Sequence, residues 1–168
     1  MNSKNNFFEL PIPTRDGRFM ARYSEKGLAG LNFPNAKAFV APKRSEGGPV
    51  PTKIRAWHRA TETALKNILA GRKPKNLPSL DLAGTEFQMN VWSALRKISS
   101  GKTKSYGEIA RAIGKPKAVR AVGGACGANP VPVLVPCHRV LAANKKLGGF
   151  SGGLDWKRSL LKREGIVL

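Results

Sequence analysis

A cysteine and a histidine stand side by side at Cys137 and His138, after the apolar run VLVP and before an arginine. A thiolate is a strong nucleophile and a soft metal ligand, and an imidazole is both a base near neutral pH and a metal ligand. Four interpretations of this pair therefore compete: a metal site, a disulfide, a catalytic thiol, and two side chains that only pack.

The other cysteine and histidine of the chain disfavour the first two interpretations. Cys126 is the second cysteine, and the second histidine, His58, lies far upstream. An adjacent Cys-His pair lacks the spacing of paired zinc ligands, so we expect no metal. In a reducing compartment both cysteines stay thiols. The pair alone leaves catalysis and packing open, so the surrounding sequence must decide between them.

The charge of the chain indicates a polyanionic partner. Among 168 residues, 30 Lys and Arg stand against 10 Asp and Glu, a formal net charge of +20. Such an excess repels itself in a compact protein and favours nucleic acid as the partner, although lysines scattered in a generally basic proteome are the alternative. No apolar run is long enough to span a membrane, and the N-terminus does not resemble a signal peptide. We therefore expect a cytoplasmic, nucleoid-associated protein without membrane contact.

The N-terminal half predicts strands followed by a helix. Period-two alternation over residues 18–33 predicts a β-hairpin with its turn at 24–27. A loop rich in proline, glycine and charge follows at 41–52. Apolar residues at helical spacing then predict a helix over 53–70. Residues 72–84 have the composition of a connector between two domains.

The C-terminal half begins with two N-terminal helix signatures. Thr85–Gln88 and Ser105–Glu108 both fit a capping box, in which the first and fourth side chains satisfy each other's backbone N–H groups. A third helical segment, 117–129, follows after a short turn. The last two helices therefore form a candidate helix-turn-helix, a motif that binds DNA.

Small residues dominate the third helical segment, AVRAVGGACGA, which has Gly123 and Gly124 at its centre. Each glycine costs about 1 kcal/mol relative to alanine inside a helix. Either the helix packs tightly against another helix, or something bulky such as DNA approaches its backbone. Arg120 is the one long charged side chain between Lys117 and Asn129, and it would project alone from this surface. We favour contact with DNA.

Three further segments surround the Cys-His pair. Three prolines in the apolar run 128–136 predict an extended, edge-like strand that ends at Cys137. The glycine loop 148–153 lacks the Lys-Ser/Thr of a phosphate-binding P-loop. A last helix is predicted over 155–164. Glu164 lies at its C-terminal end, where a carboxylate opposes the helix dipole, so this side chain either has another partner or is simply solvated.

From residue 84 to residue 165 the chain resembles the C-terminal domain of the O6-alkylguanine-DNA alkyltransferases, also called methylated-DNA–protein-cysteine methyltransferases. The matching pieces, in order and spacing, are GTEFQ, VW, SYGEIA, RAVGGA, ANPVPVLVPCHRV, GGFSGG and KRSLLKREG. PCHRV preceded by NPVP is highly specific, whereas the N-terminal half resembles the family more weakly through GRFMARYSEKGLAGLNF. The resemblance implies an α/β fold: a ribonuclease-H-like domain over 1–80, with an antiparallel sheet and a helix, and a mainly helical, winged-helix-like domain over 81–168.

The resemblance also implies a reaction. The family moves an alkyl group from O6 of guanine in double-stranded DNA onto its own cysteine, without a cofactor, and each molecule acts once as a monomer. By position the acceptor is Cys137, His138 acts as its base through a water, and Glu164 orients the histidine. A thiol must be ionised to attack, and neighbouring residues of an extended chain point to opposite sides. Direct contact between the two side chains is therefore awkward, which favours the bridging water.

The DNA-binding roles carry over by position as well. A base inside a duplex must be rotated out before it can react. In the family the helix-turn-helix enters the minor groove, which suits small residues such as Ala121 and Gly123. Arg120 matches the arginine that fills the vacated stack, and Tyr106 matches the tyrosine that crowds the target nucleotide.

The pocket for the extruded guanine is expected around the cysteine. Asn129 matches the asparagine that braces the turn before the active site, and the backbone around Cys137, Val140 and Ser151 would read the edge of the guanine. Many members have tyrosine where this chain has Phe150. That ring can still line the pocket, but the resemblance no longer implies a hydrogen bond from it.

Two rival functions remain. One is a non-catalytic helix-turn-helix module or regulator, and relatives that only sense damage replace the acceptor cysteine, which is present here as Cys137. The other is a cysteine hydrolase that uses Cys137 and His138. Some relatives bind zinc in the N-terminal domain, but this chain has no cysteine there.

Overall fold

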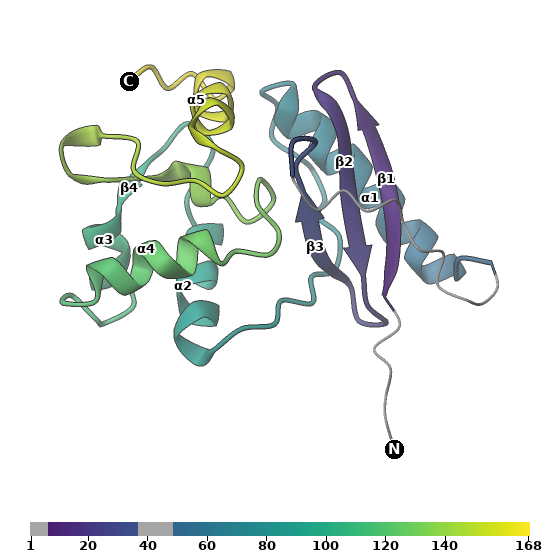
Figure 1. Ribbon diagram of the computed structural model, residues 1–168, viewed down its shortest axis with the longest axis horizontal. Helices are drawn as coiled ribbons and strands as arrows, with labels where there is room; N and C mark the ends of the chain where they lie inside the picture. The colour runs from purple at the N-terminus through teal and green to yellow at the C-terminus, as the bar shows by residue number, and fades with distance from the viewer. Residues whose placement is uncertain (1–6, 37–48) are drawn as a thin grey trace.

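The computed structural model describes residues 7–36 and 49–168, and Figure 1 shows their arrangement. The fold is mixed α/β: a three-stranded antiparallel sheet and one long helix form the N-terminal half, and shorter helices form the C-terminal half. This confirms the predicted fold class. Most of the loop expected at 41–52 lies outside the described residues.

The sheet contains the predicted hairpin and one strand that was not predicted. β2 (Gly17–Tyr23) and β3 (Leu28–Asn32) form the hairpin, and β1 (Phe8–Thr14) pairs with the other side of β2. Two prolines made β1 unrecognisable as a strand. Proline is tolerated at this position because β1 lies at an edge of the sheet, where its missing N–H costs no ladder bond.

Helix α1 (Thr52–Leu69) packs against the sheet and agrees with the helix expected over 53–70. Its buried residues recur at helical spacing: Ile54, Thr61, Ala64, Leu65, Ile68 and Leu69. The connector that follows returns to the sheet. Leu80 forms an isolated parallel bridge with Leu28, and Ser24 donates a hydrogen bond to Asp81.

Both predicted capping boxes are present. Thr85 opens α2 (Glu86–Arg96), and Ser105 opens α3 (Tyr106–Ala112). After a turn, α4 (Val119–Gly127) packs on α2 and α3, so α3 and α4 form the expected helix-turn-helix. The chain ends with α5 (Leu154–Arg163). Two short parallel strands, β4 (Lys104–Ser105) and β5 (Val140–Leu141), join the helix-turn-helix to the segment after the Cys-His pair.

The extended strand expected over 128–136 is wrong. The segment instead turns, because the Val135 N–H bonds the Val131 carbonyl at 2.9 Å and Val133 has a φ of 75°. Residues 131–138 are all buried, so their backbone polar groups need hydrogen-bond partners inside the protein, which a turn supplies locally. Cys137 then begins a short 3-10 helix, η1 (Cys137–Arg139), and a second one, η2 (Ala143–Lys145), follows β5.

Aromatic side chains join the sheet to the C-terminal half. The Phe33 ring lies 5.1 Å from the Trp156 ring and 5.6 Å from the Phe150 ring, centroid to centroid. Arg163 on α5 adds a polar link, since it pairs with Asp16 at 2.6 Å and donates to the Leu69 carbonyl at 2.6 Å. The sheet therefore contacts the loop and the helix that follow the Cys-His pair.

Candidate active site

The thiol of Cys137 is held inside the protein by Asn129. Only 3% of Cys137 is exposed, and the Asn129 side-chain amide donates to its sulfur at 3.2 Å. The same amide donates to the Val135 carbonyl at 2.8 Å, while its oxygen accepts from the Val131 N–H at 3.0 Å. Asn129 therefore ties the buried turn to the sulfur of Cys137.

Burial raises the pKa of the Cys137 thiol, although the hydrogen bond from Asn129 and the positive charge of Lys157 oppose that effect. A thiol in this state is protonated near neutral pH and is a poor nucleophile. Reaction at this sulfur therefore requires a base within reach.

His138 is fully buried, and its Nε2 lies 2.9 Å from the Glu164 carboxylate. Burial raises the pKa of Glu164, but hydrogen bonds from His138 and Arg139 outweigh it and bring the pKa to about 2. The ionised carboxylate can only accept, so Nε2 must carry the proton of this hydrogen bond. The structure thus brings together two of the residues that the sequence singled out, and Glu164 has the partner that its position suggested.

The second ring nitrogen of His138 is free. Burial lowers the pKa of His138, with Glu164 opposing and Arg139 and Lys157 adding to the shift, so the ring is neutral at neutral pH. With the proton on Nε2, Nδ1 carries a lone pair. Nδ1 is buried without a hydrogen-bond partner among the described residues. A buried acceptor of this kind, next in sequence to the thiol, is suited to take up a proton.

Arg139 fixes the carboxylate and was not singled out from the sequence. Its guanidinium donates to both Glu164 oxygens at 2.8–3.1 Å and to the Ile98 carbonyl at 2.6 Å. The Gly101 N–H adds a further hydrogen bond to the carboxylate at 3.2 Å. These contacts offset the unfavourable position of Glu164 at the C-terminus of α5 and set its distance to His138.

Lys157 is a second residue that the sequence did not reveal. Its side chain is fully buried on α5 and donates to the Val140 carbonyl at 2.7 Å and to the Gly149 carbonyl at 3.2 Å. No carboxylate of the described residues pairs with this ammonium group. Burial lowers its pKa, and the neighbouring thiols of Cys137 and Cys126 raise it. The site therefore contains a buried cation close to the sulfur that must become an anion.

Tyr106, the first residue of α3, faces the same region. The Lys157 ammonium lies 5.9 Å from the centre of its ring. Gly148 lies directly against Tyr106, since a Cβ there would come within 2.9 Å of the phenol oxygen. A Cβ on Gly123 would lie 4.0 Å from the ring, so α4 passes along its other side. Tyr106 is thus set between α4 and the glycine loop.

The outer face of α4 is open. Arg120 and Ala121 are exposed, and the Arg120 side chain forms no hydrogen bond or ion pair within the described ranges. A Cβ on Gly124 or Gly127 would meet nothing within 4 Å. Tight packing against another helix therefore does not explain these two glycines.

The remaining candidates lie in β5 and in the glycine loop. Val140 is buried in β5, Phe150 is half-buried against Phe33, and Ser151 is exposed. Gly152 lies so close to Phe33 that a Cβ would come within 2.6 Å of the ring. The loop is thus held by the sheet on one side and, through the Gly149 carbonyl, by Lys157 on the other.

The described part of the chain contains no group of three or more His, Cys, Asp or Glu side chains that could hold a metal ion. Cys126 and Cys137 are both free thiols. None of the described helices is long and apolar enough to cross a bilayer.

Comparisons with known proteins agree on one family. A family model described as the DNA-binding domain of 6-O-methylguanine DNA methyltransferase matches residues 86–166. The chain is 42% identical over 158 residues to a methylated-DNA–protein-cysteine methyltransferase of Methanosarcina acetivorans, covering 94% of this chain and 96% of that protein. It is 53% identical over 157 residues to the protein of that name from Haemophilus influenzae, covering 92% and 84% of the two chains.

Solved structures give the same result over nearly the whole chain. The crystal structure of Mycobacterium tuberculosis O6-methylguanine methyltransferase superposes with a TM-score of 0.73 at 35% identity, covering 95% of this chain and 93% of that one. The structure of the M. tuberculosis protein OGT in complex with DNA superposes with a TM-score of 0.71 at 37% identity, covering 92% and 90%.

Proposed function

Because this chain belongs to the methylated-DNA–protein-cysteine methyltransferase family, we propose that it repairs O6-alkylguanine in double-stranded DNA by transferring the alkyl group to its own Cys137. The observation that carries the proposal is the buried thiol beside a neutral imidazole whose one free nitrogen, Nδ1 of His138, is an acceptor. A thioether has no easy leaving group, so each molecule acts once.

The proposed step begins with removal of the thiol proton. A water between Cys137 and Nδ1 of His138 passes the proton to the imidazole, and Glu164 stabilises the imidazolium that forms. The thiolate then attacks the alkyl carbon: the sulfur–carbon bond forms, the carbon–O6 bond breaks, and the guanine leaves with the electron pair and takes up a proton. Cys137 begins a 3-10 helix, so the backbone here is not the extended chain expected from the sequence. The support for a bridging water is instead the buried Nδ1 of His138, which has no hydrogen-bond partner among the described residues.

Lys157 supplies charge to the same step. A thiolate at Cys137 would face a buried ammonium group that lacks a carboxylate partner among the described residues. Preorganised charge of this kind stabilises an anion more strongly in a buried site than in water. The hydrogen bonds of Lys157 to the Val140 and Gly149 carbonyls also hold the backbone that would read the guanine.

The DNA is proposed to lie against α4. Exposed glycines let the sugar-phosphate backbone approach, and Ala121 adds little bulk. Arg120 would enter the stack where the target base has left, and Tyr106 would press on the rotated nucleotide. Asn129, Val140, Phe150 and Ser151 would form the pocket around that base.

The chain would act as a monomer on DNA in the cytoplasm, associated with the nucleoid. We place the boundary between the N-terminal and C-terminal domains at residues 80 and 81, where the connector makes its last contacts with β3: Leu80 bridges Leu28, and the Asp81 N–H donates to the Leu28 carbonyl at 2.9 Å.

The proposal is tested by weighing the protein after incubation with an oligonucleotide that contains O6-methylguanine. We expect a permanent gain of one methyl group on Cys137, no gain in Cys137→Ala, and a normal gain in Cys126→Ala. Burial raises the pKa of Cys126 to about 12, so this thiol is a matched but unreactive control. Unchanged mass with retained DNA binding would instead identify a non-catalytic module, and turnover of an ester or peptide would identify a hydrolase.

A further inference from the structure

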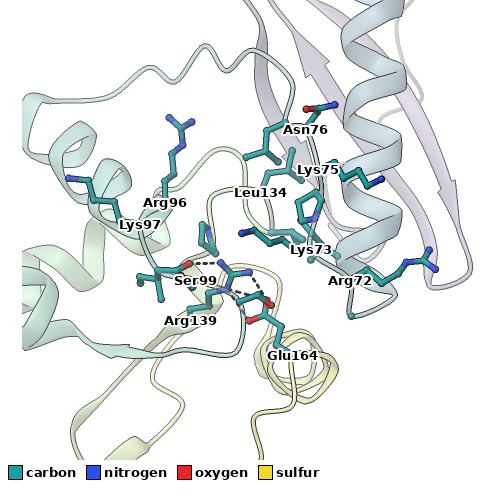
Figure 2. A pocket seen from close by; sticks show the side chains of 18 of the residues that line it. Arg72, Lys73, Lys75, Asn76, Arg96, Lys97, Ser99, Leu134, Arg139 and Glu164 are labelled. Carbon is teal, nitrogen blue, oxygen red and sulfur yellow. Dashed lines mark hydrogen bonds and ion pairs between the residues drawn. The ribbon is translucent and has the colours of Figure 1, made fainter.

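A cleft with a volume of about 690 Å³ borders the candidate active site at Arg139 and Glu164 (Figure 2). One wall comes from residues 68–77, which include the turn after α1, and the other from residues 93–100 at the end of α2. Arg139 and Glu164 lie between the walls. No residue of α3 or α4 lines this space, so it is separate from the helix-turn-helix surface. We call it the basic cleft.

Positive residues line both walls of the basic cleft, and Figure 2 shows that Lys73 extends into the space between the walls whereas Arg72, Lys75 and Lys97 extend outward from it. Arg72, Lys73 and Lys75 stand on one side, with Arg96 and Lys97 on the other. All five are exposed, and none forms an ion pair with a carboxylate of residues 7–36 or 49–168. A concave surface lined by one sign of charge concentrates counter-ions of the other sign.

The single acidic residue of the lining does not cancel this charge. Glu164 is the only carboxylate among the lining residues, and its side chain is 3% exposed. Arg139 and His138 already bind it. Five exposed cationic side chains without a carboxylate partner among the described residues therefore lie in and around the cleft.

The rest of the lining indicates what kind of anion fits. Asn76, Ser93, Ser99 and Ser100 offer neutral hydrogen-bond donors beside the charges, a combination that suits phosphate oxygens. No aromatic side chain lines the cleft. Sites for single-stranded nucleic acid use aromatic rings on which bases stack. Their absence from this lining favours a duplex, whose bases are already stacked on one another.

We propose that the basic cleft binds the phosphate backbone of a second DNA duplex, distinct from the duplex that contacts α4. One protein molecule would then bridge two duplexes, or two distant parts of one. No covalent step is involved, and undamaged DNA is a sufficient ligand. The proposal therefore stands or falls separately from alkyl transfer.

The test mixes the full-length protein with two short undamaged duplexes, one labelled with a donor dye and one with an acceptor. Wild-type protein should produce energy transfer that disappears with rising salt. Two variants neutralise one wall each, Arg72→Gln/Lys73→Gln/Lys75→Gln and Arg96→Gln/Lys97→Gln. Each should raise the protein concentration needed for bridging by at least about tenfold, because two or three phosphate contacts are lost.

A matched control removes three exposed positive charges that do not line the cleft, in Arg15→Gln/Lys26→Gln/Arg59→Gln. This control should bridge like the wild type. Binding of a single labelled duplex, followed by fluorescence anisotropy, should be retained in the cleft variants, as should their methyl-transfer rate. Their melting temperatures should match that of the wild type, since all the substituted side chains are exposed.

Two outcomes would overturn the proposal. The first is a wild type that does not bridge, and binding of inorganic tripolyphosphate in the cleft would then identify a site for compact polyphosphates instead. The second is bridging that survives in both cleft variants, as it would if two protein molecules paired to join the duplexes. Inhibition of wild-type bridging by tripolyphosphate would support the proposal.

Discussion

The two ring nitrogens of His138 have different surroundings, and this difference determines what the residue can do. Nε2 donates to Glu164 at 2.9 Å, whereas Nδ1 is buried without a partner among the described residues. The carboxylate fixes both the tautomer and the orientation of the ring. A histidine fixed in this way has its lone pair on a known atom before any substrate binds.

The transfer rate should therefore fall on the acid side of neutral. Burial lowers the pKa of His138 below its usual 6.5, so the ring stays neutral until the pH drops below that value and then loses its lone pair. His138→Ala should slow transfer by about 10²–10⁴-fold at neutral pH, the usual contribution of a general base. Single-turnover rates measured across the pH range check both statements.

Glu164→Gln gives the sharper test of the same arrangement. The carboxylate raises the pKa of His138, so its loss should move the acid limb of the rate profile to still lower pH and reduce the maximal rate. DNA affinity should not change, because Glu164 is buried. An acid limb that stays in place, or moves toward neutral pH, would show that His138 is not the group that titrates.

Arg120 should act by its shape as well as its charge. A flat guanidinium can replace a stacked base, whereas the ammonium group of lysine copies only the charge. Arg120→Ala should strongly slow repair of duplex DNA, Arg120→Lys should recover part of the rate, and both should react almost normally with free alkylguanine. Second-order rates on a duplex, a duplex mismatched at the lesion and the free base distinguish these roles. If Arg120→Lys repaired duplex DNA at the wild-type rate, Arg120 would instead act as a phosphate contact.

Candidate site residues that belong to a sequence motif could be predicted, whereas a residue whose role depends only on its being buried could not. Cys137, His138 and Glu164 follow from the PCHRV and KREG pieces. Lys157 was missed because a lysine in a basic helix is usually solvated. A signal existed, since Lys157 shares the helical spacing of the buried Leu160 and Leu161, and a charge on an apolar face needs a partner.

At the scale of elements, local signals were reliable and turns were not. Both capping boxes were correct because each is satisfied within four residues of sequence. The strand β1 and the turn at Val131–Val135 were missed because prolines and apolar residues permit several backbone paths. Which path is taken depends on β2 for the first and on Asn129 for the second.

The open glycines of α4 lead to a prediction with two opposite effects. Gly124→Ala meets no neighbour within 4 Å and restores helix propensity, so it should stabilise the protein by up to about 1 kcal/mol. The same methyl group should weaken DNA binding if the backbone of α4 faces the groove. Chemical denaturation and duplex binding measure the two effects. If Gly124→Ala stabilises the protein without lowering its affinity for the duplex, the DNA does not bind against this face of α4.

At the scale of the whole molecule, the sheet helps to position the reactive half. Phe33, the residue that follows β3, packs on Phe19, Trp156 and Phe150 and touches Gly152. The sequence indicated two units joined by a connector, but contacts between distant segments leave no local pattern. The position of the sheet against the glycine loop was therefore outside what the sequence could predict.

Gly152→Ala should test this contact. The added Cβ would lie 2.6 Å from the Phe33 ring and should shift the glycine loop away from that ring, which would disturb the pocket proposed beside the cysteine. We expect a slower transfer rate with nearly unchanged DNA affinity, because α4 is not disturbed. Phe33→Leu in the same chain should make room for the new methyl group and recover part of the rate. If the rate losses of Gly152→Ala and Phe33→Leu simply add in the double variant, the contact between Gly152 and Phe33 does not cause the slower transfer.

The hydrogen bond from Asn129 to the sulfur of Cys137, 3.2 Å long, has a further consequence once the alkyl group has arrived. The sulfur is then a thioether with an extra carbon in a close-packed interior, and overpacking of this kind costs about 1–3 kcal/mol. Each kcal/mol lowers the melting temperature of a chain of this size by about 2–4 °C. Calorimetry before and after reaction should show the drop in the wild type and in Cys126→Ala, and none in Cys137→Ala exposed to the same DNA. Used molecules would then be the first to unfold and be degraded, so the reaction of a single sulfur would set the lifetime of the whole chain.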